Sequence, residues 1–238
     1  MYYYGKNTIK GLVESKTNLE VIYLQKGFKD KNYIDYLRNN NQVLKFVESN
    51  ELEKLAKGKN HQGVIAKGFE YTYTNVDEII SKNQDNENSV VVILDGLEDP
   101  QNFGSIIRTG EALNISGIVI PKNRSVSVNP TVAKVSTGAI NEVSIAQETN
   151  LRAVVKKLKD NGYWVVSADM DTDVLYDQVD YKMKVALIIG SEGKGISMQL
   201  NKESDFVVKL PMYGNVSSLN AAVSTAIILY QINSNRHQ

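Results

Sequence analysis

The residues best suited to chemistry lie in three stretches of this sequence, and each stretch follows a predicted strand. The stretches are DGLEDPQNFGSIIR at 95–108, GSEGKG at 190–195 and LPMYGNVSSLN at 210–220. An amide or hydroxyl can orient a substrate, a guanidinium stabilises negative charge, and glycine lets a ligand approach the backbone. These stretches predict a ligand site, whose candidate residues are Asn102, Arg108, Glu192, Ser218 and Asn220.

Each of these residues also has a simpler structural interpretation. Asn102 is placed to cap a helix, and Arg108 is placed to be an ordinary surface residue of that helix. Glu192 can be solvated or can accept hydrogen bonds from the amides of its own loop. Ser218 and Asn220 stand where a last helix is predicted to begin, so both can be capping residues. None of the three stretches decides between these interpretations when it is taken alone.

The glycine stretch itself argues against two common ligands. It follows an apolar run, 185–189, as a ligand-binding loop follows a buried strand. Gly190 and Gly195 have the spacing of a phosphate-binding loop, but Ile196 stands where that loop needs its lysine. The G-x-G-x-x-G order of dinucleotide sites is also absent. The loop is therefore expected to bind something other than ATP or NAD.

Composition narrows the chemistry further. The 238 residues include no cysteine and only two histidines, His61 and His237. Thiolate nucleophiles and iron–sulfur clusters are thereby excluded, and Ser-His-Asp hydrolases and His-based metal sites are disfavoured. The net charge is zero, although residues 1–82 carry 13 Lys and Arg against 10 Asp and Glu. We expect no metal.

The sequence gives no sign of a membrane segment. No apolar run approaches the roughly 20 residues that a membrane-spanning helix needs. The first residues, MYYYGKNTIKG, lack the apolar segment of a signal peptide. We therefore expect a cytoplasmic protein.

The chain is predicted to fold as two α/β domains. A polar stretch at 81–89 predicts a domain at 1–82, a linker at 83–88 and a second domain at 89–238. In the first, the expected strands are 19–24, 43–47 and 63–67, with helices at 30–38 and 50–56, the latter capped by Asn50. In the second domain we expect a largely parallel sheet with helices on both faces. Its expected strands are 90–94, 117–120, 143–145, 164–168, 185–189 and 206–210. Helices are expected at 102–112, from 129, at 151–159 and at 218–230.

The three stretches together resemble a known set of motifs. The order N-x-G-x-x-x-R from Asn102, then IIGSEGKGIS, then LPM…SSLNAA is similar to the three motifs of the SpoU/TrmH class of the SPOUT superfamily of RNA methyltransferases. Tyr4-Gly5 and the stretch NHQGV at 60–64 resemble the substrate-binding domain of RlmB-type enzymes. The resemblance covers nearly the whole chain.

This resemblance implies a fold, a cofactor and an activity. The fold is a parallel sheet with a C-terminal trefoil knot, and the protein is a homodimer through its last helix. The activity is S-adenosylmethionine-dependent 2′-O-methylation of a guanosine ribose in large-subunit ribosomal RNA. The resemblance places four residues in the cofactor pocket: Gly190, Leu210, Met212 and Leu219.

The resemblance also assigns roles to the polar residues. Arg108 is the main catalytic candidate, and because a guanidinium stays protonated we expect it to stabilise charge rather than to act as a base. Asn102 and Glu192 are expected to position Arg108 and the loop, and Ser218 and Asn220 to orient the ribose or the knot. The first domain is expected to select the RNA, with four candidate phosphate contacts at Lys54, Lys57, Lys59 and His61.

Two other functions stay open on the sequence. One is 2′-O-methylation of tRNA by an enzyme of the same class, although the N-terminal domain favours ribosomal RNA. The other is a non-catalytic RNA-binding factor for ribosome assembly. Binding of S-adenosylmethionine, measured by calorimetry, separates this second function from an enzyme.

Overall fold

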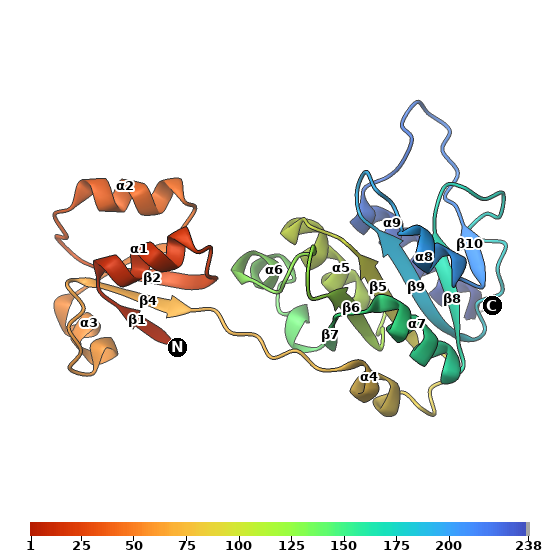
Figure 1. The fold of residues 1–238 in the computed structure, drawn as a ribbon, viewed down its shortest axis with the longest axis horizontal. Helices are drawn as coiled ribbons and strands as arrows, with labels where there is room; N and C mark the ends of the chain where they lie inside the picture. Colours follow the sequence, from red (N-terminus) through yellow and green to blue (C-terminus); the bar gives the residue numbers. More distant parts are fainter. Residues whose placement is uncertain (237–238) are drawn as a thin grey trace. The chain divides into compact units, whose positions relative to one another are not determined.

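The computed structural model describes residues 1–236, so His237 lies outside the described residues. The chain divides into two compact units, Met1–Tyr71 and Thr72–Gln238. Each unit contains its own sheet with helices packed against it (Figure 1).

The small unit is a four-stranded mixed sheet with helices on both faces. Its spatial order is β1-β4-β2-β3, with β1 (Tyr2–Tyr4), β2 (Leu19–Gln25), β3 (Leu44–Val47) and β4 (Val64–Gly68). Helices α1 (Lys6–Glu14) and α2 (Lys31–Asn39) share one core cluster with Ala66. Helix α3 (Ser49–Ala56) packs in a second cluster with Ile65. Because neighbouring residues of a strand point to opposite faces, the two clusters lie on opposite sides of the sheet.

The large unit is built on a six-stranded parallel sheet in the order β10-β8-β9-β5-β6-β7. The strands are β5 (Val90–Asp95), β6 (Gly117–Pro121), β7 (Ile145–Glu148), β8 (Tyr163–Ala168), β9 (Lys184–Gly190) and β10 (Phe206–Val208). The helices are α4 (Val76–Lys82), α5 (Pro100–Ala112), α6 (Pro130–Val135), α7 (Leu151–Asp160), α8 (Met198–Lys202) and α9 (Ala221–Arg236), with a 3₁₀ turn at Ala139–Asn141.

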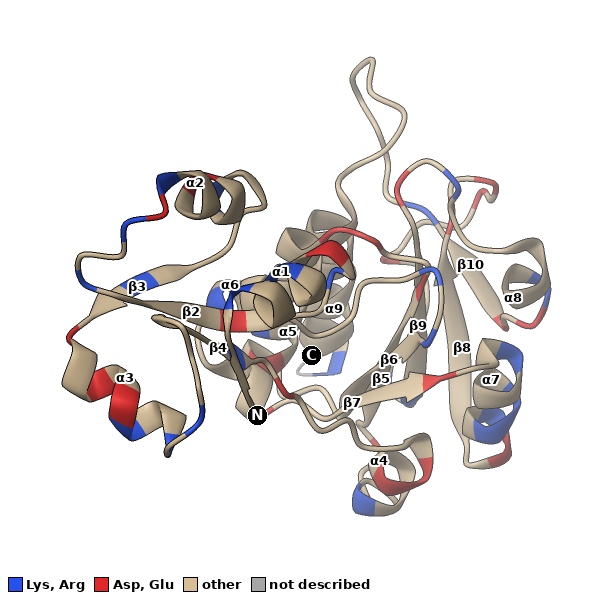
Figure 2. Cartoon of the chain, turned by 60° about the vertical axis from the view of Figure 1, so that its left-hand side comes forward, with Lys and Arg blue, Asp and Glu red and all other residues tan. Residues whose placement is uncertain are grey.

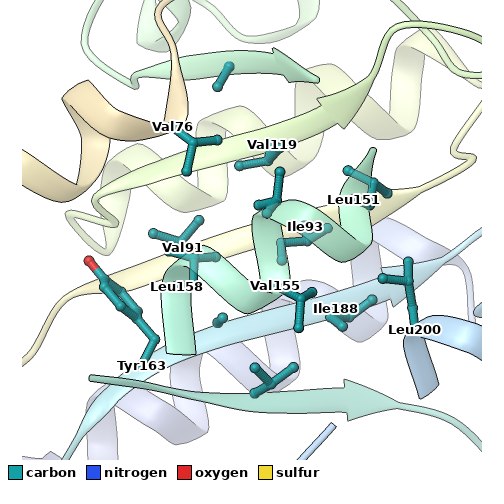
Figure 3. Packing of buried hydrophobic residues seen from close by; sticks show 14 of the residues in the cluster. Val76, Val91, Ile93, Val119, Leu151, Val155, Leu158, Tyr163, Ile188 and Leu200 are labelled. Carbon is teal, nitrogen blue, oxygen red and sulfur yellow. The ribbon is translucent and has the colours of Figure 1, made fainter. Parts of the chain in front are cut away.

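Helices cover both faces of this sheet, as predicted. Helices α4, α7 and α8 share one core cluster with the central strands. In Figure 3, Leu158 and Val155 of α7 lie over Val91, Ile93 and Ile188 of the strands. Helices α5 and α9 pack against each other, and α9 also contacts β9. Figure 2 shows basic residues along α7, where they are exposed to solvent opposite its buried apolar side. The apolar runs of β5 and β9 are buried on both faces, which is typical of parallel sheets.

The boundary between the units differs from the predicted linker at 83–88. The units meet between Tyr71 and Thr72, and α4 belongs to the large unit because Val76, Ile79 and Ile80 are buried in its core. The predicted linker is a connection within the large unit, where Lys184 Nζ donates to Gln84 O (2.6 Å). The polar composition of this stretch reflects turns on the surface rather than a domain boundary.

Several predicted helix ends were also wrong. Helix α3 begins at Ser49, and its preceding residue, Glu48, makes no side-chain cap hydrogen bond, so Asn50 is not the cap. The last helix begins at Ala221 rather than Ser218. Strand β1 and helix α1 were not predicted at all, because Gly11 interrupts a short apolar pattern whose buried members are Ile9 and Val13.

Candidate functional site

The strand order of the large unit reverses between β5 and β9. Strands β5, β6 and β7 proceed to one side, whereas β9, β8 and β10 lie on the other. Asp95 and Gly190 are register partners where these two strands end. In open α/β sheets, ligands bind at the carboxyl ends of strands where the order reverses. Two cavities lie at this edge.

The first cavity has a volume of about 340 Å³. Its walls come from the ends of β8, β9 and β10, from the glycine loop 190–195, and from the start of α9. The four residues expected to line a cofactor pocket all line this cavity: Gly190, Leu210, Met212 and Leu219. The segment 213–218 between β10 and α9 is exposed, and Figure 1 shows it extending away from the sheet.

The glycine loop folds back on its own strand. Ser191 and Gly195 exchange two backbone hydrogen bonds, with N–O distances of 3.2 and 3.0 Å. A Cβ on Gly190 would lie 2.2 Å from the carbonyl carbon of Gly195. Gly193 and Gly195 adopt φ angles of +86° and +66°, which glycine tolerates best. Gly190 is therefore required by the loop's own backbone, in addition to its exposure to the cavity.

Three predicted polar residues meet between the loop, α5 and α9. Asn102 Nδ2 donates to Glu192 Oε1 (2.7 Å), and Asn220 Nδ2 donates to the same oxygen (3.1 Å). Asn220 Nδ2 also donates to Asn102 Oδ1 (2.9 Å). We call Asn102, Glu192 and Asn220 the polar cluster. It ties together segments that are 28 to 118 residues apart in the sequence.

The polar cluster settles the simpler interpretations of these residues. Asp99 caps α5, accepting from Gln101 N and Asn102 N, so Asn102 is not the cap. Asn220 does cap α9, because its Oδ1 accepts from Ala222 N (2.9 Å) while its amide joins the cluster. Glu192 accepts from these two side-chain amides.

The two remaining predicted residues are placed differently. Ser218 lines the first cavity, is exposed, and makes no hydrogen bond with another residue of 1–236. Arg108 lies on the exposed side of α5 and lines neither cavity. Six residues of α-helix place its Cα about 9 Å along the axis from that of Asn102. Within residues 1–236 the side chain of Arg108 has no hydrogen bond and no ion pair. The structure of one chain thus does not bring Arg108 into the cluster.

The second cavity, of about 630 Å³, was not predicted from the sequence. It is formed by residues 95–99 after β5, by the turn after β6, and by the glycine loop. Its charged residues that sequence reasoning missed are Glu98, Arg124 and Lys194. The position of Arg124 three residues after β6, at the carboxyl edge of the sheet, is the one signal that could have identified it.

One predicted contact of the small unit is structural instead. His61 is 9% exposed, its Nδ1 accepts from Gly63 N (3.1 Å), and its Nε2 lies 3.1 Å from Glu53 Oε1. The accepting Nδ1 leaves the proton of the neutral ring on Nε2, which then donates to Glu53. His61 therefore fixes the turn before β4. Over residues 1–236, no group of His, Cys, Asp and Glu could hold a metal ion, and no helix is long and apolar enough to cross a membrane.

Comparison with known families covers both units. Residues 89–230 match the model of the SpoU rRNA methylase family. Residues 2–74 match the model for RNA 2′-O ribose methyltransferase substrate binding.

Among curated proteins, the chain is 40% identical to a protein of Staphylococcus haemolyticus described as a TrmH family tRNA/rRNA methyltransferase. The match spans 98% of this chain and 95% of that protein. A protein of Staphylococcus epidermidis with the same description is 39% identical over the same shares.

Solved structures show the same fold at lower identity. The SpoU methyltransferase AviRb from Streptomyces viridochromogenes, in complex with the cofactor AdoMet, has a TM-score of 0.66 and 23% identity, and the match covers 100% of this chain and 90% of that one. An AdoMet-bound rRNA methyltransferase from Sinorhizobium meliloti has a TM-score of 0.64 and 22% identity, with 98% and 86% covered. By the two family models and by its curated relatives, this chain belongs to the SpoU/TrmH family of RNA methyltransferases.

Proposed function

We propose that this protein methylates the 2′-hydroxyl of a guanosine ribose in large-subunit ribosomal RNA, with S-adenosylmethionine as methyl donor. The observation that carries the proposal is the first cavity, which lies at the carboxyl ends of β8, β9 and β10 and is walled by the residues that the family motifs single out. We place this activity in the cytoplasm.

The first cavity suits S-adenosylmethionine in size and lining. Its volume of about 340 Å³ lies in the range of small-molecule pockets. Leu210, Met212 and Leu219 would hold the apolar parts of the cofactor, and the backbone of the glycine loop its polar parts. When bound, the sulfonium supplies an activated methyl group. The segment 190–221 would form the trefoil knot that the resemblance implies.

The chain's own residues contribute mainly alignment. Holding two reactants in the right geometry contributes on the order of 7–11 kcal/mol. The polar cluster fixes the glycine loop against the starts of α5 and α9, so it holds two walls of the first cavity. Ser218, whose hydroxyl has no partner in the described chain, is free to bind the ribose.

Arg108 is the proposed catalytic residue. Its guanidinium would bind a phosphate of the RNA and stabilise the charge that develops on the ribose oxygen; removing such a donor typically costs about 2.7–4 kcal/mol. Because Arg108 lines neither cavity of its own chain, we infer that it acts in the assembled homodimer. Arg108→Ala should bind S-adenosylmethionine normally but methylate RNA about a hundredfold more slowly; wild-type turnover would refute the assignment.

The exposed face of α9 supports the homodimer. Val223 and Tyr230 are 47% and 58% exposed, and with Ile227 they follow helical spacing along one side. An apolar helix face of this kind is typical of an interface between subunits. Tyr230→Glu should give a monomer in analytical ultracentrifugation, and Lys156→Glu, on the exposed side of α7, is the matched control.

The small unit is proposed to bind the RNA. It carries 12 Lys and Arg against 8 Asp and Glu, a net charge of +4, whereas the rest of the chain has 15 against 19. Lys59 Nζ lies 5.0 Å from the ring centroid of Tyr4, and Lys45 Nζ lies 5.8 Å from that of Tyr23. Lysines beside aromatic rings can contact phosphates while the rings stack on bases.

Neutralising lysines of the small unit tests this role. Replacing Lys45, Lys54 and Lys59 with glutamine should weaken binding to a large-subunit rRNA transcript and flatten its salt dependence. The affinity for S-adenosylmethionine should not change, because the first cavity lies wholly within the large unit. An unchanged rRNA affinity and salt slope would remove the small unit from the RNA-binding surface.

A further inference from the structure

The second cavity contains charged side chains that the fold leaves unpaired. Three of its carboxylates have partners: Asp95 accepts from Ser197 N (2.7 Å), Asp99 caps α5, and Glu192 belongs to the polar cluster. The remaining charged residues in its lining are Glu98, Arg124 and Lys194. None of these three has a hydrogen bond or ion pair with another residue of 1–236. Two cations and one carboxylate are thus available to a ligand.

The segments that carry these side chains are held in place. Leu97 is 1% exposed, and its carbonyl accepts from Val126 N (2.7 Å) and from Ser125 Oγ (3.0 Å). These bonds hold Ser125, which follows Arg124, against Leu97, which precedes Glu98. The segments that present Arg124 and Glu98 therefore have a defined spacing across the cavity.

The second cavity adjoins the first. Ser191, Glu192 and Gly195 line both cavities, so the glycine loop is a wall that they share. A ligand in the second cavity would therefore lie beside the methyl donor proposed for the first. The volume of about 630 Å³ is within the range of pockets that hold small molecules.

We propose that the second cavity binds the target nucleotide, with Arg124 and Lys194 on phosphate and Glu98 on the base, which is guanine. This inference rests on the proposed function. Arginine and lysine are the usual partners of phosphate oxygens. An ionised carboxylate only accepts hydrogen bonds, and guanine offers two adjacent donors, N1–H and the N2 amino group, on its Watson–Crick edge. Enzymes that do chemistry on a base read the flipped base at that edge, and a ribose-modifying enzyme can identify its target nucleotide by the same contacts.

The phosphate contacts are tested with single substitutions. Arg124→Ala and Lys194→Ala should each weaken binding to a large-subunit rRNA transcript about tenfold and reduce the slope of log K against log salt by about 0.7–0.9, the value for one phosphate contact. Lys122→Ala is the matched control, because Lys122 is exposed on the same segment and lines neither cavity. If Arg124→Ala and Lys194→Ala behave like Lys122→Ala, the phosphate assignment is overturned.

The base contact is tested on nucleotides that differ by one group. Inosine 5′-monophosphate lacks the N2 amino group of guanosine 5′-monophosphate, and loss of one arm of a bidentate contact to a base typically costs about tenfold in affinity. In ligand-observed NMR, the wild type should bind the guanosine nucleotide about tenfold more tightly, and Glu98→Gln should bind both equally. Equal binding by the wild type, or a preference kept by Glu98→Gln, would overturn the assignment. This binding assay involves no methyl transfer, so a failure of the base assignment can be distinguished from a failure of the proposed activity.

Discussion

Asn220 has two hydrogen-bonding roles that different substitutions can separate. Its Oδ1 caps α9, while its Nδ2 joins the polar cluster by donating to Asn102 Oδ1 and Glu192 Oε1. Serine is as good a helix cap as asparagine but is too short to bridge the cluster, and aspartate keeps the cap but removes the donor. Alanine removes both functions.

The expected magnitude follows from the two donated hydrogen bonds. A hydrogen bond between neutral groups contributes about 0.5–1.5 kcal/mol net to stability. Because Glu192 is exposed to solvent, we apply this range to it rather than the larger range for hydrogen bonds to charged groups. Losing both bonds removes about 2 kcal/mol of the free energy that holds the cavity walls in their binding conformation. Cofactor binding must then restore that conformation, which lowers the affinity for the cofactor about 30-fold. Losing the cap costs about a further 1 kcal/mol of stability.

The assay combines calorimetry with thermal unfolding. Asn220→Ser, Asn220→Asp and Asn220→Ala should all bind S-adenosylmethionine about 30-fold more weakly. In unfolding, the alanine protein should be less stable than the serine protein by about 1 kcal/mol. The reasoning is refuted if the serine and aspartate proteins bind the cofactor like the wild type, or if serine destabilises as much as alanine.

Three further predictions concern the framework of the fold. Arg236 donates to three backbone carbonyls, and burial lowers its pKa without discharging it. In denaturant unfolding, Arg236→Ala should therefore lower the free energy of unfolding by about 3 kcal/mol. Arg236→Lys should recover only part of this loss. Gly190→Ala forces a Cβ into the loop backbone, so it should lose about 3 kcal/mol of stability, whereas Gly214→Ala, with open space around its Cβ, should be neutral. Burial raises the pKa of Tyr33 to about 12. The stability this contributes is full below about pH 10 and is lost as the pH rises through the folded pKa, so the stability difference between wild type and Tyr33→Phe should shrink over that range. A difference that stays constant with pH would contradict the pKa shift.

The parallel sheet of the large unit was predictable because its two central strands contain long apolar runs. Val90–Asp95 and Lys184–Gly190 read as buried strands for the same reason that they pack on both faces. Helix α4 was missed because its short apolar pattern adjoins a polar stretch that resembles a linker. Asn102 was one possible cap of α5, but Asp99 before Pro100 makes the cap.

The site was only partly predictable, because its geometry is not local. The motif residues of the polar cluster were identified, but the sequence does not show which of their side chains are hydrogen-bonded to one another. The separation of Arg108 from the cluster depends on its position six residues along α5 and on its side chain being on the exposed side of that helix. The second cavity brings together Glu98, Arg124 and Lys194 from separate loops, and of these only Lys194 lies within a motif, where it was not singled out.

Ribose-methylation mapping is the decisive measurement for the proposed activity. Ribosomal and transfer RNA from cells that lack this protein are compared with RNA from cells that carry the wild type or Arg108→Ala. We expect one guanosine 2′-O-methyl mark to disappear from the large-subunit ribosomal RNA of cells that lack the protein. The wild type should restore this mark, and Arg108→Ala should not. A complete set of marks in the large subunit of cells that lack the protein would contradict the account.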